Sequence, residues 1–333
     1  MAFRLSSDET ADKGIRRIVA EELESAISNL RNEDESLKGE GIHEARKSVK
    51  KLRAVTRLLM PGLGASGVRD NRALRDAGRA LSALRDAAAL IETVESLSEH
   101  YFADPAIEQL AVVRSALRRR LEQTVRSEDC RTVIGGAMAS LKSVKKRAGK
   151  WQIAGGGFAA IAPGLEGTYR RGRKQMRRAK ANPDSENLHK LRKRVKEHWY
   201  HVRLLEGPLS KMGESHLREK ELSKVQEWLG DDHNLTVMRE AITGEPQSFG
   251  GKKVVPAVLE LISRVQKKLR ENALEVAEKL YEAKPGEYIQ SAGVAWDLWQ
   301  TTATASKPVS SLKGASERAD SGRSRHRSRR PAA

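Results

Sequence analysis

Apolar residues recur every three or four positions along most of this chain, as they do in helices that bury one face. Few stretches alternate apolar with polar residues, so the sequence contains no convincing strand. The pattern predicts helices over residues 13–30, 42–60, 68–100, 105–127, 130–147, 165–181, 186–206, 212–242, 255–284 and 287–299. We therefore expect an all-α fold.

Glycine and proline mark the expected breaks between these helices. Pro61 and Gly62 should end the helix over 42–60, while the Gly135-Gly136 pair and Gly293 should interrupt the weaker helices over 130–147 and 287–299. The elements then follow the same order before and after a glycine-rich stretch. This order indicates an internal duplication.

The duplication gives the expected domain organisation. A first helical half covers residues 1–147, a Gly-rich linker 148–162, a second helical half 163–300, and a basic tail 301–333. The tail is rich in arginine and serine and cannot bury a core, so we expect it to be disordered. It would act as a solubilising or nonspecifically adhesive segment, or as a contact for nucleic acid.

One uncommon sequence motif occurs twice, first from His43 to Lys50 and again from His189 to Lys196. Both copies have the form His-x-x-Arg-Lys-x-Val-Lys, and each continues to a further arginine, Arg57 or Arg203. With about 100° per helical residue, the basic residues of each copy fall within one arc of roughly 100° behind the histidine. Apolar residues occupy the opposite side. Each copy thus predicts a helix that buries one face and carries a row of cations on the other.

Such rows have an electrostatic cost, because like charges at this spacing repel by about 0.2–0.5 kcal/mol per pair. A bound anion would relieve the repulsion. Arginine forms bidentate contacts with phosphate oxygens, lysine is a mobile point charge, and histidine gains charge beside a polyanion. The simpler interpretation is two solvated basic faces whose histidines cap local helix starts. The matched repetition favours an anion-binding surface.

The net charge of the chain narrows the classes of partner that it is expected to bind. The 333 residues include 62 Lys+Arg against 44 Asp+Glu, a formal net charge of +18, which favours nucleic acid, anionic membranes or phosphate polymers. Aromatic residues make up only 4%, which argues against base stacking. A single cysteine, Cys130, permits no intrachain disulfide, and we see neither a signal core nor an apolar run of spanning length. We therefore expect a soluble cytoplasmic protein without a membrane span.

Competing chemical motifs are incomplete. Residues 43–47 lack the second histidine of a zinc protease motif, and His198 and His201 have no convincing third ligand. The consecutive Asp231, Asp232 and His233 would diverge on a helix. The Gly155-Gly156-Gly157 stretch lacks the Gly-Lys-Ser/Thr ending of a phosphate loop. We expect no metal site, no cofactor and no catalytic residues.

The repeated His-x-x-Arg-x-x-x-Lys pattern in an all-helical basic chain resembles the CHAD family (conserved histidine α-helical domain), over roughly residues 13–300. Residues 81–86 resemble the family's Leu-Gly-x-x-Arg-Asp word, residues 229–234 its second copy, and residues 169–174 the usual opening of the second half. The resemblance implies two tandem four-helix-bundle-like repeats with pseudo-twofold symmetry. A basic central channel between them would bind inorganic polyphosphate.

The helical arcs and the resemblance together predict the polyphosphate-binding residues. They are His43, Arg46, Lys47, Lys50, Lys51, Arg53, Arg57, His189, Arg192, Lys193, Lys196 and Arg203. Three positions depart from the family pattern: Glu197 and Trp199 replace basic residues, and Asn234 replaces an aspartate. Arg85 and Asp86 are expected to form a structural pair.

The expected function is noncatalytic binding of inorganic polyphosphate in the cytoplasm, at polyphosphate granules. Polyphosphate-cleaving enzymes need carboxylates to hold a divalent metal, and none aligns with the repeated face. The acidic strand motif of the triphosphate tunnel enzymes is also absent. The main alternative is nonspecific binding of a nucleic-acid duplex backbone, aided by the tail. A polyphosphatase or kinase, and a granule coat protein held by amphipathic helices, are further alternatives.

Overall fold

The fold is described by a computed structural model that covers residues 3–31, 39–84, 86–125, 129–212 and 215–305. The described residues form helices joined by turns and contain no strand, which confirms the all-α prediction. The helices are α1 (Ala11–Arg31), α3 (Glu40–Leu58), α4 (Met60–Ala83), α5 (Asp86–His100), α6 (Ile107–Val125), α7 (Asp129–Ala148), α8 (Ala162–Ala181), α9 (Ser185–Leu204), α10 (Glu206–Leu209), α11 (Ser215–Gly244), α12 (Val255–Leu280) and α13 (Pro285–Ala305). Short 3-10 turns are η1 (Gly157–Ala160), η2 (Ser210–Met212), η3 (Pro246–Phe249) and η4 (Gly251–Lys253).

Several predicted breaks were wrong. The helix predicted over 68–100 is divided into α4 and α5. Helix α4 begins at Met60, with Pro61 in its first turn, and the break expected near Pro61 and Gly62 falls at Gly64, where non-helical backbone dihedrals kink the helix. Proline is tolerated in the first turn because the N–H groups there have no intrahelical partner. The Gly135-Gly136 pair does not interrupt α7, and Gly293 does not interrupt α13. Helix α13 continues to Ala305, and the rest of the predicted tail lies outside the described residues.

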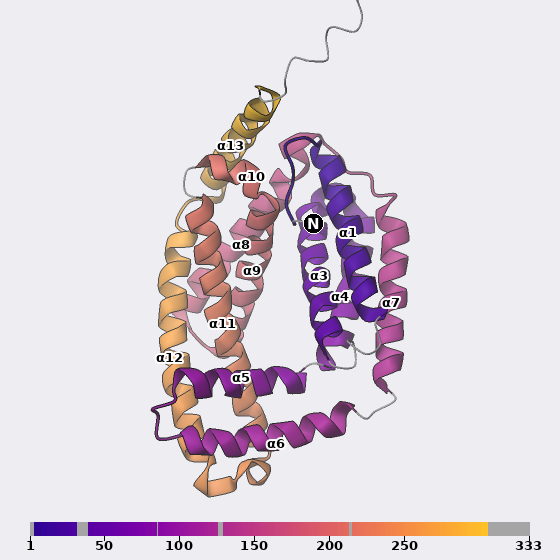
Figure 1. The fold of residues 1–333 in the computed structure, drawn as a ribbon. Helices are drawn as coiled ribbons and strands as arrows, with labels where there is room; N and C mark the ends of the chain where they lie inside the picture. Colours follow the sequence, from indigo (N-terminus) through magenta and orange to yellow (C-terminus); the bar gives the residue numbers. More distant parts are fainter. Residues whose placement is uncertain (1–2, 32–38, 85, 126–128, 213–214, 306–333) are drawn as a thin grey trace, which may run out of the picture.

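The helices form two upright groups, α1, α3, α4 and α7 on one side and α8, α9, α11 and α12 on the other (Figure 1). Within the first group α3 packs against α1 and α4, and α7 against both α1 and α4. Within the second, α9 packs against α8 and α11, and α11 against α12. Helices α5 and α6 lie across the lower end, where they contact α11 and α12. The chain therefore crosses from the first group to the second and back before α7.

Two hydrophobic cores hold this arrangement together. The larger is continuous through both upright groups and includes Ile15, Leu52, Leu58 and Leu191, all buried. The smaller joins α5 and α6 to α11 and α12 through residues such as Val94, Leu110, Val113, Met238 and Val258. Because part of the first predicted half packs only in the second core, the two groups are not independent units.

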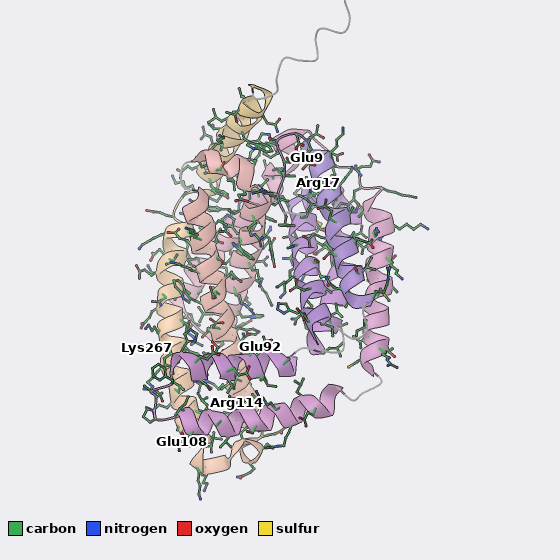
Figure 2. The ribbon with its side chains drawn as sticks, viewed as in Figure 1. Glu9, Arg17, Glu92, Glu108, Arg114 and Lys267 are labelled. Carbon is green, nitrogen blue, oxygen red and sulfur yellow. The ribbon has the colours of Figure 1, made fainter. Side chains whose placement is uncertain are left out.

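The N-terminal segment ties the upper ends of the two groups together. Phe3 and Leu5 are buried, and the Leu5 amide donates to the Leu204 carbonyl at the end of α9 over 3.0 Å. Arg17 on α1 donates to Glu9 Oε1 over 2.6 Å, and Figure 2 shows the two side chains together at this end. The guanidinium of Arg17 keeps the pKa of Glu9 below its ordinary value.

The end of α3 abuts the start of α8 with no room for a side chain. A Cβ placed on Gly164 would lie 1.8 Å from the Leu58 carbonyl oxygen, which is a backbone atom that cannot rotate away. Nearby, His201 on α9 donates from Nε2 to the Ala54 carbonyl over 2.9 Å. These contacts set how closely α3 approaches α8 and α9.

We expect Gly164→Ala to destabilise the protein by about 3 kcal/mol or more, because overpacking against backbone forces a helix shift. Gly136→Ala is the matched control, since its Cβ would meet open space within a helix. That change should stabilise by about 0.5–1 kcal/mol through helix propensity. Chemical denaturation of both variants measures the difference, and similar stabilities would contradict the close approach at Gly164.

Candidate functional site

A cavity of about 700 Å³ lies between the two upright groups. Side chains of α3, α4, α5, α9 and α11 line it. The cationic lining residues are Arg46, Lys50, Arg53, Arg57, Arg75, Arg79, Arg192, Lys193, Arg194 and Lys196. Glu197 is the one carboxylate among the described lining residues. We call this space the basic cavity.

The basic cavity brings together much of both predicted cationic rows. From the first row Arg46, Lys50, Arg53 and Arg57 line it, and from the second His189, Arg192, Lys193 and Lys196. Helices α3 and α9 pack against each other, with their apolar faces in the larger core, so these polar faces meet across the space between the groups. The role of these residues as ligands stays a prediction.

Four predicted residues do not line the cavity. Lys47 pairs with Glu44 at 2.6 Å, and Lys51 pairs with Glu22 at 2.7 Å and lies 5.4 Å from the centre of the Phe3 ring. The Arg203 guanidinium lies 4.9 Å from the centre of the Trp199 ring. His43 is half-buried near the start of α3, outside the lining. Only the Lys51–Glu22 pair joins two helices, α3 and α1, whereas Lys47 and Arg203 contact residues three and four positions before them in their own helices.

The structure adds cations that the sequence interpretation missed. Arg75 and Arg79 line the cavity from α4, and Arg194 lines it from α9. Arg72, Arg75 and Arg79 follow helical spacing, so a basic face on α4 could have been found. The signal is weak, because no histidine precedes this row as it does in the repeated motif, and because the clearest feature of the segment is its apolar stripe.

Two histidines meet in the cavity. The rings of His189 on α9 and His233 on α11 have their centres 4.2 Å apart. Burial, together with the charges of Arg192 and Lys193, lowers the pKa of each imidazole to about 4. Both rings are therefore neutral at pH 7 in the unliganded protein.

Buried polar atoms in this region lack partners. Among the described residues, His189 Nδ1 and Arg192 Nε have no hydrogen-bond partner although both are shielded from solvent. Burial, with Arg192 and Arg46 adding to it, lowers the pKa of Lys196 to about 8. A buried polar atom without a partner, such as His189 Nδ1 or Arg192 Nε, costs about 1–3 kcal/mol. The unliganded cavity is therefore energetically unfavourable.

Glu197 organises the rim of the basic cavity. Its carboxylate accepts from Arg57 over 2.8 Å, and from Arg171 and Arg194 over 3.2 Å each. Burial alone would raise the pKa of Glu197, but these guanidinium groups, with Arg57 contributing most, lower it instead. Glu197, which replaces a basic residue of the family pattern, thus neutralises part of the first cationic row through its pair with Arg57.

The other candidate sites do not assemble. Asp232 points away from the cavity to Arg270, with Nε to Oδ1 at 2.6 Å, whereas His233 points into it, so the two diverge as expected. His198 contacts the hydroxyls of Tyr281 and Tyr288 in the core. No group of three or more His, Cys, Asp or Glu side chains within the described ranges could hold a metal ion. The pair expected of Arg85 and Asp86 lies outside the described side chains.

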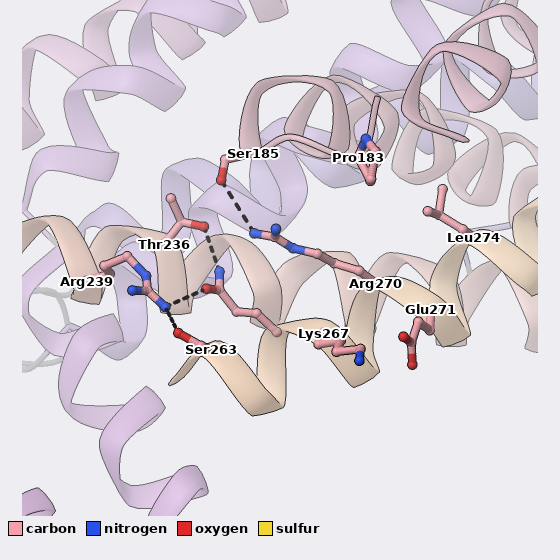
Figure 3. Close-up of a pocket in the computed structure, with 10 residues that line it drawn as sticks. Pro183, Ser185, Thr236, Arg239, Ser263, Lys267, Arg270, Glu271 and Leu274 are labelled. Carbon is pink, nitrogen blue, oxygen red and sulfur yellow. Dashed lines mark hydrogen bonds between the residues drawn. The ribbon is translucent and has the colours of Figure 1, made fainter. Parts of the chain in front are cut away.

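A second hollow of about 540 Å³ lies between α11, α12 and the start of α9 (Figure 3). Arg239 and Arg270 enter it, but each is held by protein groups. Arg270 is paired with Asp232, and Arg239 donates to Ser263 Oγ over 2.8 Å. This hollow therefore has fewer available cations than the basic cavity.

Comparison with known proteins identifies the fold. The sequence model of the CHAD domain matches residues 21–243. The chain belongs to the CHAD family. The matched segment includes every lining residue of the basic cavity.

A solved CHAD structure shares the architecture. The chain is similar to the crystal structure of the CHAD domain from the plant Ricinus communis, with a TM-score of 0.55 and 18% sequence identity, over 85% of this chain and 95% of that chain. At that identity the likeness establishes the fold alone. No curated protein matches the chain. Within the described part of this CHAD protein, no helix combines the length and hydrophobicity needed to cross a membrane.

We expect Glu197→Gln to destabilise this CHAD protein by about 1–3 kcal/mol, because three arginines lose a buried anionic partner while staying partly solvated. High salt should reduce the loss by screening the remaining charges. Glu44→Gln is the control, since the exposed Glu44–Lys47 pair should contribute less than about 1 kcal/mol. Denaturation at two salt concentrations tests this, and equal effects of the two changes would contradict a special role for Glu197.

Proposed function

We propose that this CHAD protein binds inorganic polyphosphate in the basic cavity without cleaving it. The observation that carries the proposal is the convergence of two cationic helix faces, far apart in sequence, on one cavity. The only described carboxylate in its lining already accepts hydrogen bonds from three arginines. An anionic ligand would supply partners for the unpaired His189 and Arg192 atoms and would offset the positive charge of the lining.

A flexible phosphate chain suits this cavity better than nucleic acid does. A volume of about 700 Å³ lies within the range of small-ligand sites, roughly 300–1,000 Å³, and would not admit a duplex. Single-stranded nucleic acid is usually held by stacking its bases on aromatic rings. Apart from its histidines, the described lining contains one aromatic side chain, Tyr200. Polyphosphate has no bases to stack and carries charge along its whole length.

Binding without catalysis is supported by the state of Glu197. Metal-assisted phosphate hydrolysis uses carboxylates to hold the cation, whereas this carboxylate is surrounded by guanidinium groups. Phosphate release from polyphosphate after addition of Mg²⁺ or Mn²⁺ would overturn this part of the proposal. A cytoplasmic location at polyphosphate granules belongs to the same proposal, and co-localisation of a fluorescent fusion with stained granules tests it.

Replacing Arg46, Lys50, Arg192 and Lys196 together by alanine should reduce polyphosphate affinity at least 100-fold, since phosphate contacts and counterion release provide most of the binding free energy. Titration calorimetry at several salt concentrations measures the loss. Helicity by circular dichroism should persist, because the apolar faces of α3 and α9 are unchanged.

The control for this variant replaces four exposed lysines, Lys142, Lys146, Lys252 and Lys253, and so removes the same charge elsewhere. Equal losses in the two variants would contradict a defined site. Competition separates the nucleic-acid alternative: polyphosphate should displace the protein from duplex DNA at a far lower phosphate concentration than DNA displaces it from polyphosphate. The reverse order would favour nucleic acid.

Polyphosphate affinity should fall as pH rises above about 8, where Lys196 loses its proton in the free protein. The ligand favours the charged form, so binding at pH 9 should be accompanied by proton uptake. The affinity should drop by up to about tenfold per pH unit from this group alone.

Lys196→Arg should flatten the decline, because arginine stays charged. Calorimetry in two buffers of different ionisation enthalpy measures the uptake, with Lys142→Arg as the control. A decline unaffected by Lys196→Arg would contradict the assignment.

A further inference from the structure

Cations continue outside the basic cavity along one face of α8. Arg171, Lys174 and Arg178 are separated by three and four residues, so they lie on the same side of the helix. All three are exposed. We call these residues the α8 ledge.

The ledge begins at the rim of the cavity. Arg171 of the ledge and Arg194 of the cavity lining donate to different oxygens of the Glu197 carboxylate, each over 3.2 Å. Two guanidinium groups bound to one carboxylate are immediate neighbours. No carboxylate other than Glu197 intervenes in the described contacts at this point.

From the rim the ledge runs along α8, which packs beside α9. The two helices run antiparallel, since Thr168 contacts Glu197 while Gln175 contacts Asn187. Lys174 therefore lies beside the α9 segment between Asn187 and Arg194, which includes the exposed Lys190. With a rise of about 1.5 Å per residue, Arg171 to Arg178 spans about 10 Å. The ledge thus runs alongside α9, from the level of Glu197 toward the level of Asn187.

The outer two cations of the ledge are available to a ligand. Among the described residues, neither Lys174 nor Arg178 takes part in an ion pair, whereas neighbouring cations of α8 do. Arg170 pairs with Glu166, and Lys180 pairs with Glu278. Lys174 and Arg178 thus align with Arg171 and are free of ion pairs among the described contacts.

We propose that the α8 ledge is a second binding segment for the part of a long polyphosphate chain that emerges from the basic cavity, and that it makes the protein select long chains over short ones. This inference rests on the proposed function. A chain already held in the cavity presents its emerging phosphates to the ledge at high effective concentration, so even weak contacts there raise the affinity. A chain too short to leave the cavity gains nothing from the ledge.

The test is the double variant Lys174→Ala, Arg178→Ala, which leaves Arg171 and its bond to Glu197 in place. Affinity for long-chain polyphosphate should fall by about tenfold. The slope of log affinity against log salt should become shallower by about 1 for each cation removed. Affinity for tripolyphosphate should stay unchanged. Unchanged long-chain binding, or an equal loss for tripolyphosphate, overturns the ledge proposal.

Two matched variants complete the test. Lys252→Ala, Lys253→Ala removes the same charge from exposed positions in η4 and should leave long-chain binding intact; an equal loss there would mean that only net charge matters and would overturn the ledge. The charge-preserving variant Lys174→Arg, Arg178→Lys should bind long chains as the parent does. Tripolyphosphate binding that survives loss of the four cavity cations would instead refute the proposed function, so the two failures are distinguishable.

Discussion

The ion cluster at Glu197 is the interaction on which the basic cavity depends. It joins Arg57 of α3, Arg171 of α8 and Arg194 of α9 to one buried carboxylate. Without an anion at this point, the cationic faces of α3 and α9 would meet with uncompensated repulsion at the contact between the two helix groups. A single carboxylate lets the three helices approach closely, yet Arg192, Lys193 and Lys196 have no carboxylate partner among the described contacts. The structure is thereby held together while its attraction for anions is kept.

Two unrelated constraints keep that cluster in place. The absence of a side chain at Gly164 lets the end of α3 contact the start of α8, and the smaller core holds α5 and α6 against α11 and α12. Helix α5 also contributes Ala89 and Leu90 to the lining of the cavity. Helix α5, which follows the first group in the sequence, thus helps to close a cavity whose other walls come from both groups. Because both groups contribute walls, the cavity exists only when the complete arrangement has formed.

Sequence periodicity was sufficient for the helices and for the basic faces of α3 and α9, because both depend on local spacing. It failed where partners come from distant segments. The Arg57–Glu197 and Lys51–Glu22 pairs each join residues of different helices that lie far apart in the sequence. Helix α7 persists through Gly135-Gly136 because Ile134, Leu141 and Val144 on its buried side outweigh the low helix propensity of glycine. Arg75 and Arg79 became recognisable as lining residues only once α4 was placed opposite α9.

The features that make the unliganded cavity unfavourable are also those that favour binding. Burial lowers the pKa values of His189, His233 and Lys196, so the empty protein holds these protons less tightly than ordinary side chains do. A polyanion reverses each effect, since it supplies opposite charge and hydrogen-bond acceptors in a space of low dielectric constant. Ligand binding must then stabilise the fold, because the unfolded chain lacks the assembled cavity. Part of the intrinsic stability of the domain is thus given up in the free state and recovered with its ligand.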